Sequence, residues 1–205
     1  MLSHLPELHR FVLQELVKEE ESFPKTFVDC GCGNGVWGFL YKVATLSRKE
    51  SKDTLLIGLD LDFKCLIFCK RHKIYDCLIR ADVRYLPLRC KTIDILLASE
   101  LIEHLKKEDG YLFLKEVERV CRGIIVITTP NGYLPMPTHI SGWSPKEFKK
   151  LKYKVHGIGL KYAKLHFGKL PKWFRGTLAY ISTPISYIVP ELSEVLICIK
   201  EIKIK

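Results

Sequence analysis

Apolar residues along this chain follow two periods, one typical of helices and one typical of buried strands. The helical spacing of three and four residues recurs in five stretches, which are residues 5–21, 36–46, 62–72, 106–121 and 144–151. Short, nearly continuous apolar runs predict seven strands, at residues 26–30, 55–60, 77–81, 92–98, 123–129, 153–158 and 194–202. Strands and helices alternate over most of the chain, so we predict an α/β fold in which helices cover both faces of a parallel sheet.

A glycine-rich turn follows the first predicted strand. It reads Asp29-Cys30-Gly31-Cys32-Gly33-Asn34-Gly35, and a helical pattern begins at Val36. Glycine tolerates a positive φ and lets a ligand lie against bare backbone, while the helix that follows offers unpaired N–H groups. The turn therefore predicts a binding site for a small, nucleotide-like ligand.

Two kinds of ligand fit this turn. Residues 33–38 satisfy the dinucleotide pattern G-x-G-x-x-G, so a nicotinamide-dependent oxidoreductase is one hypothesis. Asp29 favours the other, because a carboxylate near a pyrophosphate is unfavourable but suits a ligand with ammonium and sulfonium charges. The pattern Asp29-x-Gly31-x-Gly33-x-Gly35 resembles motif I of the class I S-adenosylmethionine (SAM)-dependent methyltransferases.

This resemblance covers residues 26–131 and carries expectations about the fold. It implies a Rossmann-like α/β fold with a seven-stranded sheet, helices on both faces and an antiparallel last strand. A chain of 205 residues allows a single domain over residues 1–205, since one core can serve a chain of this length. Within it, we expect the helix at 5–21 to cover the cofactor pocket and the segment at about 159–190 to form a lid.

The resemblance also implies which residues contact SAM. Asp60 ends the second predicted strand, where an acid can accept hydrogen bonds from both ribose hydroxyls, and Leu61 would lie beside the adenine. Asp82 and Val83 correspond to the contact that the family makes with the adenine amino group. Taken alone, either Asp could instead be a turn or helix-capping residue. The full predicted cofactor set is Asp29, Gly31, Cys32, Gly33, Asn34, Gly35, Asp60, Leu61, Asp82, Val83 and Ser99.

Acidic and imidazole side chains gather after the fourth predicted strand, in Glu100, Glu103 and His104. If this segment is helical, the three side chains share one face. Such a group can bind a divalent cation or supply a base for a substrate hydroxyl. Alternatively, the first Glu caps a helix and the His packs locally. We predict these three as catalytic residues, and we favour O-methylation because no N-P-P-Y-like segment follows the strand.

A second, more local resemblance involves residues on both sides of the fifth strand. Glu100-x-x-Glu103-His104, Thr128-Thr129-Pro130-Asn131 and His139 ahead of Trp143 resemble the small-RNA 3′-terminal 2′-O-methyltransferases. In those enzymes two Glu and two His bind a divalent cation that holds the terminal 2′ and 3′ hydroxyls. The resemblance implies a metal site for Mg²⁺ or Mn²⁺ at Glu100, Glu103, His104 and His139. The first two elements also look like small-molecule O-methyltransferases, so the acceptor stays open between a small molecule and RNA.

Positive charge is concentrated in the last third of the chain. Residues 1–140 hold 20 Lys and Arg against 19 Asp and Glu, whereas residues 141–205 hold 13 against 4. Between residues 159 and 190 the basic residues alternate with aromatic ones. This composition suits an anionic substrate, a nucleic acid or an anionic membrane surface, or simply a lid packed onto the sheet. A non-catalytic RNA- or membrane-binding module is therefore a further hypothesis.

The remaining composition excludes several classes of protein. The eight cysteines include no C-x-x-C pair and mostly lie in apolar runs, so we expect reduced thiols rather than a disulfide framework or zinc site. No apolar run approaches the ~18 residues of a membrane span, and the N-terminal stretch lacks the pattern of a signal peptide. A cytoplasmic location is the expectation that follows.

Overall fold

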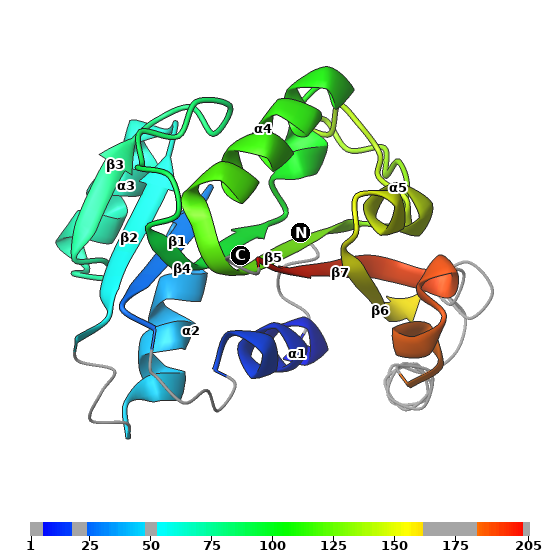
Figure 1. Cartoon of the computed structure of the whole chain (residues 1–205), viewed down its shortest axis with the longest axis horizontal. Helices are drawn as coiled ribbons and strands as arrows, with labels where there is room; N and C mark the ends of the chain where they lie inside the picture. The colour runs from blue at the N-terminus through cyan, green and yellow to red at the C-terminus, as the bar shows by residue number, and fades with distance from the viewer. Residues whose placement is uncertain (1–5, 18–23, 48–52, 162–183, 203–205) are drawn as a thin grey trace.

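A seven-stranded sheet forms the centre of the protein (Figure 1). The computed structural model describes residues 6–17, 24–47, 53–161 and 184–202. Its strands are β1 (Thr26–Cys30), β2 (Leu55–Asp60), β3 (Cys77–Arg80), β4 (Ile93–Ser99), β5 (Cys121–Pro130), β6 (Lys154–Leu160) and β7 (Ser193–Glu201). They lie in the order β3-β2-β1-β4-β5-β7-β6. β7 runs antiparallel to both of its neighbours, β5 and β6, and the other described strand pairs are parallel, which confirms the predicted Rossmann-like fold with an antiparallel last strand.

Helices cover both faces of this sheet. They are α1 (Pro6–Leu16), α2 (Val36–Thr45), α3 (Phe63–Arg71), α4 (Lys107–Val120) and α5 (Pro145–Lys150). In Figure 1, α4 and α5 lie on the opposite side of the sheet from α1 and α2. Buried side chains of α1, α2 and α3 belong to one apolar cluster, whereas those of α4 and α5 belong to another. The sheet therefore separates two cores.

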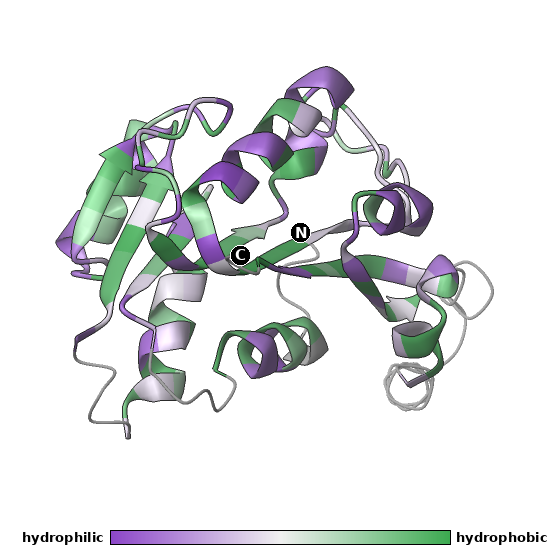
Figure 2. Ribbon diagram, in the orientation of Figure 1, coloured by the Kyte–Doolittle hydropathy of each residue, from purple (hydrophilic) through white to green (hydrophobic). Residues whose placement is uncertain are grey.

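The alternating direction of side chains along the strands explains these two cores. Phe27 and Val28 are neighbours in β1, yet each is fully buried in a different cluster, and the same holds for Leu96 and Leu97 in β4. Successive strand side chains point to opposite faces, and a parallel sheet buries both. Figure 2 shows the same arrangement, with hydrophobic strands at the centre and hydrophilic residues on the outer surfaces of the helices.

Two boundaries near the expected helices are informative. The predicted helix at 106–121 ends at Val120, and Cys121 already pairs with Ile93 as the first residue of β5. The helix therefore runs directly into the strand, two residues before the strand was expected. Ser144 caps α5 as expected, in a capping box with Glu147 and with Pro145 at the first helical position.

Two predicted features extend beyond the described residues. Residues 18–21 of the first predicted helix and residues 162–183, which make up most of the predicted lid, lie outside them. Within the described part of the lid, residues 184–188 are helical and Pro190–Leu192 form a short 3-10 helix, η3. No helix among the described residues is long and apolar enough to cross a membrane.

Candidate cofactor and metal site

The glycine turn after β1 takes the backbone shape that its sequence predicts. Gly31, Gly33 and Gly35 have φ values of 71°, 50° and 79°, which L side chains rarely adopt. The N–H groups of Gly31 and Cys32 donate to the carbonyl of Leu59 at 2.7 and 3.0 Å. These bonds attach the turn to the end of β2.

The backbone at Gly33 faces open space. A Cβ built there would meet no atom within 4 Å, whereas one at Gly31 would lie 2.9 Å from Leu101 Cδ1 and one at Gly35 would lie 2.7 Å from Ile74 Cδ1. Packing thus requires glycine at the outer two positions, and the middle position leaves bare backbone accessible to a ligand. This is the cradle expected for SAM.

Asp60 connects this cradle to the next strand. One carboxylate oxygen, Oδ2, accepts from the N–H of Gly33 at 2.8 Å, and Oδ1 accepts from the N–H of Asp62 at 2.8 Å. The carboxylate at the end of β2 is therefore held directly beside the glycine turn. An acid in this place can receive the hydroxyls of a ribose.

A cavity of about 510 Å³ lies along the carboxyl ends of the parallel strands. Seven of the predicted site residues line it: Gly31, Asp60, Leu61, Asp82, Val83, Glu100 and His104. The other predicted cofactor residues, Asp29, Cys32, Gly33, Asn34, Gly35 and Ser99, do not. Among these, Asp29 and Cys32 are buried, and Ser99 Oγ pairs with Thr128 Oγ1 at 2.8 Å. The cavity brings together five of the eleven expected cofactor residues and two of the three predicted catalytic residues.

Arg84 is a cavity residue that the sequence analysis did not identify. Its guanidinium donates to Asp82 Oδ1 at 3.0 Å and to Oδ2 at 2.6 Å, and it donates to Asp109 Oδ2 at 3.2 Å. The hydrogen bonds from Arg84 hold the pKa of Asp82 below its usual value. Asp82 therefore meets a ligand as an ionised, paired carboxylate. An Arg two residues after the acid was the only sequence signal for this pair.

The acidic segment after β4 is not the helix that its spacing suggested. Glu100 has a positive φ of 53°, and the turn that follows is a short 3-10 helix, η2 (Ile102–His104). Glu100 therefore lies before the helical turn, so the three residues do not share an α-helical face. The condition for a shared helical face is therefore not met, because a left-handed residue separates the end of the strand from the turn.

Glu103 is buried at the centre of this segment. Its side chain is 1% exposed, Oε2 accepts from Thr129 Oγ1 at 3.0 Å, and Oε1 has no hydrogen-bond partner among the described residues. Burial raises the pKa of the Glu103 carboxyl. Burial and the charge of Glu103 also raise the pKa of Glu100. A cation would compensate this buried negative charge.

Two imidazoles complete the group. His104 Nδ1 lies 2.8 Å from the carbonyl oxygen of Thr138, and His139 Nδ1 lies 3.0 Å from that of Leu134. A carbonyl only accepts hydrogen bonds, so each Nδ1 carries a proton, and in the neutral imidazole Nε2 then keeps the lone pair. Burial, together with the charge of His104, lowers the pKa of His139, which favours its neutral form. The neutral ring with its proton on Nδ1 can ligate a metal through Nε2.

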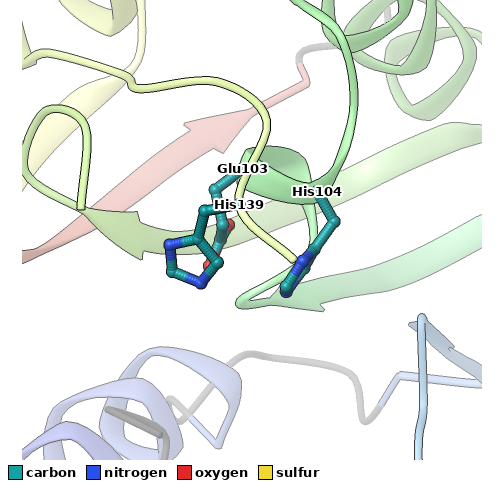
Figure 3. A group of neighbouring side chains, drawn as sticks. All are labelled: Glu103, His104 and His139. Carbon is teal, nitrogen blue, oxygen red and sulfur yellow. The ribbon is translucent and has the colours of Figure 1, made fainter. Parts of the chain in front are cut away.

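The side chains of Glu103 and His104, which belong to η2, converge with that of His139 from the loop after β5 (Figure 3). One ligand atom from each lies within 4.8 Å of the others, and the two imidazole centroids are 4.9 Å apart. Glu100, the fourth expected ligand, is outside this group. The structure therefore brings together three of the four residues expected at the metal.

Two sets of contacts hold the loop that carries His139 in place. The carbonyl of Glu103 accepts from the N–H groups of Ile140 and Ser141 at 2.8 and 3.0 Å. Trp143 is fully buried, and its Nε1 donates to Ser141 Oγ at 3.1 Å. Ser141 belongs to no recognisable sequence motif, and its place beneath the cluster depends on contacts between distant segments.

Together, the strand order, the open glycine cradle and the strand-terminal carboxylate of Asp60 form the arrangement expected of a class I SAM-dependent methyltransferase. A family model described as a methyltransferase domain matches residues 28–127. These residues accordingly form a methyltransferase domain, which favours the SAM interpretation of the glycine turn over the dinucleotide one. A comparison with curated protein sequences found no match.

Solved structures with this fold are numerous and distant in sequence. The small RNA methyltransferase HEN1 is 16% identical with a TM-score of 0.66, and the similarity covers 97% of this chain but 25% of that one. A SAM-dependent methyltransferase from Archaeoglobus fulgidus is 18% identical with a TM-score of 0.59, covering 94% of each chain. A chain in a complex of the Haloferax volcanii Trm112 methyltransferase activator and a methyltransferase is 16% identical, with a TM-score of 0.63 and coverage of 96% and 88%. At these identities the similarity shows the shared fold.

Proposed function

We propose that this methyltransferase transfers a methyl group to a hydroxyl oxygen, and that Glu103, His104 and His139 hold a divalent cation beside that hydroxyl. The observation that carries the proposal is the pairing of both imidazole Nδ1 atoms with backbone carbonyls. In the neutral rings it leaves a lone pair on each Nε2, and the two imidazoles and the buried Glu103 carboxylate each offer one ligand atom within 4.8 Å of the others. Imidazole ligands favour a transition metal over Mg²⁺, so Mn²⁺ is the first ion to test.

Glu100 is assigned to the acceptor side of the same site. Its carboxylate lines the cavity, and one of its oxygens is buried without a hydrogen-bond partner among the described residues. Glu100 would either complete the ligand set or accept the proton of the hydroxyl. In both roles its raised pKa matters, since a carboxyl that binds protons more tightly is a stronger base.

The residues of the chain mainly position the two reactants. Asp60 and the glycine turn would hold the cofactor, and the Glu103 group would hold the acceptor at the neighbouring strand ends. When bound, SAM supplies the sulfonium methyl and the cation lowers the pKa of the acceptor hydroxyl. The hydrogen bond from Thr129 fixes Glu103 in place, which is the usual contribution of a residue behind a metal ligand.

The 3′-terminal ribose of an RNA is the acceptor that we favour. Its neighbouring 2′ and 3′ hydroxyls can bind one hard cation together. The similarity of fold to the small RNA methyltransferase HEN1 and the excess of positive charge in residues 141–205 support this choice. A small molecule with a hydroxyl group is the second candidate, because the same residues would serve it.

Methyl transfer from labelled SAM to short RNAs tests the acceptor. We expect transfer to an RNA with a free 3′-terminal diol in the presence of Mn²⁺, and none to the same RNA with a 2′-deoxy terminus. Chelation with EDTA should abolish transfer. Equal labelling of the deoxy RNA, or labelling confined to a pool of small hydroxyl compounds, would exclude the RNA terminus as the acceptor.

A direct binding measurement tests the metal site independently of the acceptor. We expect calorimetry to show Mn²⁺ binding that His139→Ala weakens by about tenfold or more, as when a ligand or its support is removed. His72→Ala is the matched control, because this exposed imidazole follows α3. Equal Mn²⁺ affinity in both variants would refute the assignment of His139.

A further inference from the structure

Tyr75 reaches from the turn after α3 to the base of the glycine turn. Its hydroxyl donates to Asp29 Oδ2 and accepts from the N–H of Gly38 at 3.2 Å. The Tyr75 side chain is 7% exposed and that of Asp29 is 1% exposed. Since Gly38 belongs to the first turn of α2, one hydroxyl connects the motif acid with the helix that follows the turn.

Two glycines make room for the Tyr75 ring. A Cβ at Gly38 would lie 2.3 Å from Cε1 of the ring, and a Cβ at Gly58 would lie 2.6 Å from Cδ2. Real Cβ atoms do not come this close to another carbon, so the ring fits only because both residues lack a side chain. Because this narrow slot holds the ring, the hydroxyl has a defined position beneath the turn.

The second oxygen of Asp29 remains available. Oδ1 is buried and has no hydrogen-bond partner among the described residues. The titratable groups that act on Asp29 or are influenced by it are Tyr75, Asp60, Cys30, Cys32 and Cys69. Among these only Asp60 ordinarily carries a charge at neutral pH, and it is negative. The site therefore lacks a cation, although one buried carboxylate oxygen could receive one.

The pKa of Asp29 depends in part on the hydroxyl of Tyr75. The pKa of Asp29 is raised to about 7: burial is the largest cause, the hydrogen bond from Tyr75 acts in the opposite direction, and the charge of Asp60 contributes to the rise. Burial and the charge of Asp29 raise the pKa of Tyr75, so the phenol stays protonated and remains a donor. Without this donor, Asp29 would bind its proton more tightly.

We propose that Tyr75 is a positioning residue for SAM, whose hydroxyl orients Asp29 and favours its ionised form as an acceptor for the ammonium group of the cofactor. The inference rests on membership of the methyltransferase class and not on the proposed acceptor or metal. It concerns cofactor affinity, which can be measured with neither of them present.

The test is SAM affinity of the full chain, measured by calorimetry from pH 6 to 7.5. Tyr75→Phe removes only the hydroxyl and keeps the ring between Gly38 and Gly58. We expect the dissociation constant at pH 7 to rise about tenfold, as for the loss of a hydrogen bond to a charged group. The rise of affinity with pH should also move to higher pH. Tyr153→Phe is the matched control: it removes another buried phenol, which bonds to Glu118 at 3.4 Å.

The Asp29→Asn background separates positioning from a purely structural role. If Tyr75 acts through the charge of Asp29, Tyr75→Phe should change SAM affinity less than twofold in that background. The remaining affinity should not vary between pH 6 and 7.5. Unchanged affinity in the single variant would overturn the proposal. So would a loss that is the same at every pH and equal in both backgrounds, and urea unfolding of each variant would confirm that the protein measured is folded.

Discussion

Gly110 lies in the first turns of α4 and packs against Trp143, which holds the loop that carries His139. A Cβ at Gly110 would lie 2.4 Å from Trp143 Cζ2 and 3.2 Å from Cη2. Carbon atoms in contact are ordinarily about 3.5–4.0 Å apart. In the variant Gly110→Ala the indole must therefore move by roughly 1 Å, because contact distance is restored only by such a shift.

Two effects of opposite sign decide the stability of Gly110→Ala. Alanine favours a helix interior over glycine by about 1 kcal/mol, whereas overpacking a tight core costs about 1–3 kcal/mol. The indole cannot shift freely, because Lys107 Nζ lies 3.6 Å from its centroid and Nε1 donates to Ser141. Losing that hydrogen bond costs about 1 kcal/mol more. We expect overpacking to win, so that the free energy of unfolding falls by about 1–3 kcal/mol.

The displacement of Trp143 in Gly110→Ala should disturb the metal site and leave the cofactor site intact. Trp143 bonds to Ser141, whose N–H donates to the carbonyl of Glu103. We expect Gly110→Ala to weaken Mn²⁺ binding by about tenfold, the lower range for a residue that supports a ligand. SAM affinity should stay within twofold. Urea unfolding gives the stability, and separate calorimetric titrations give the two affinities.

Trp143→Phe provides the matched background, since phenylalanine lacks the Cζ2 and Cη2 atoms that the new methyl group meets. Gly110→Ala should then cost less stability than it does in the natural background. A Gly110→Ala variant as stable as the natural protein would refute the packing argument. A destabilised variant with unchanged Mn²⁺ affinity would show that Trp143 does not position His139.

Three further substitutions test other parts of the molecule. Asp60→Ala should weaken SAM binding by about tenfold or more in calorimetry, because it removes a charged acceptor; unchanged affinity would exclude Asp60 from the cofactor site. Gly33→Ala should lower SAM affinity more than stability. Its φ of 50° costs about 1–2 kcal/mol of folding free energy, whereas the new Cβ enters the open space that we expect the cofactor to occupy. A larger effect in urea unfolding than in calorimetry would contradict this. Burial opposes ionisation of Asp94, but hydrogen bonds from Arg122 and Thr26 outweigh it and lower its pKa. The folded state therefore favours the ionised form, so Asp94→Asn should destabilise most above pH 4, and the difference in unfolding free energy should shrink as pH falls. A difference that does not change with pH would refute this.

The periodicity of apolar residues predicted the sheet and the helices on both faces, and the family resemblance implied the antiparallel last strand. Asp29, the three glycines of the turn and Asp60 were also recognisable, because a turn with positive φ angles requires glycine and strand ends meet at one edge of a sheet. These features depend on neighbouring residues or on a regular spacing. Local backbone preference is enough to specify them.

Tertiary structure decided which polar groups meet. Glu100 does not share a helical face with Glu103 and His104, because its φ is positive. Glu103 lies beside the imidazoles of His104 and His139. The lone pairs of those imidazoles depend on carbonyls of residues 134 and 138. Tyr75 acquired its place from glycines in two different elements. Such contacts join residues far apart in sequence, and burial in a shared core, which no local pattern records, determines both their geometry and their pKa values.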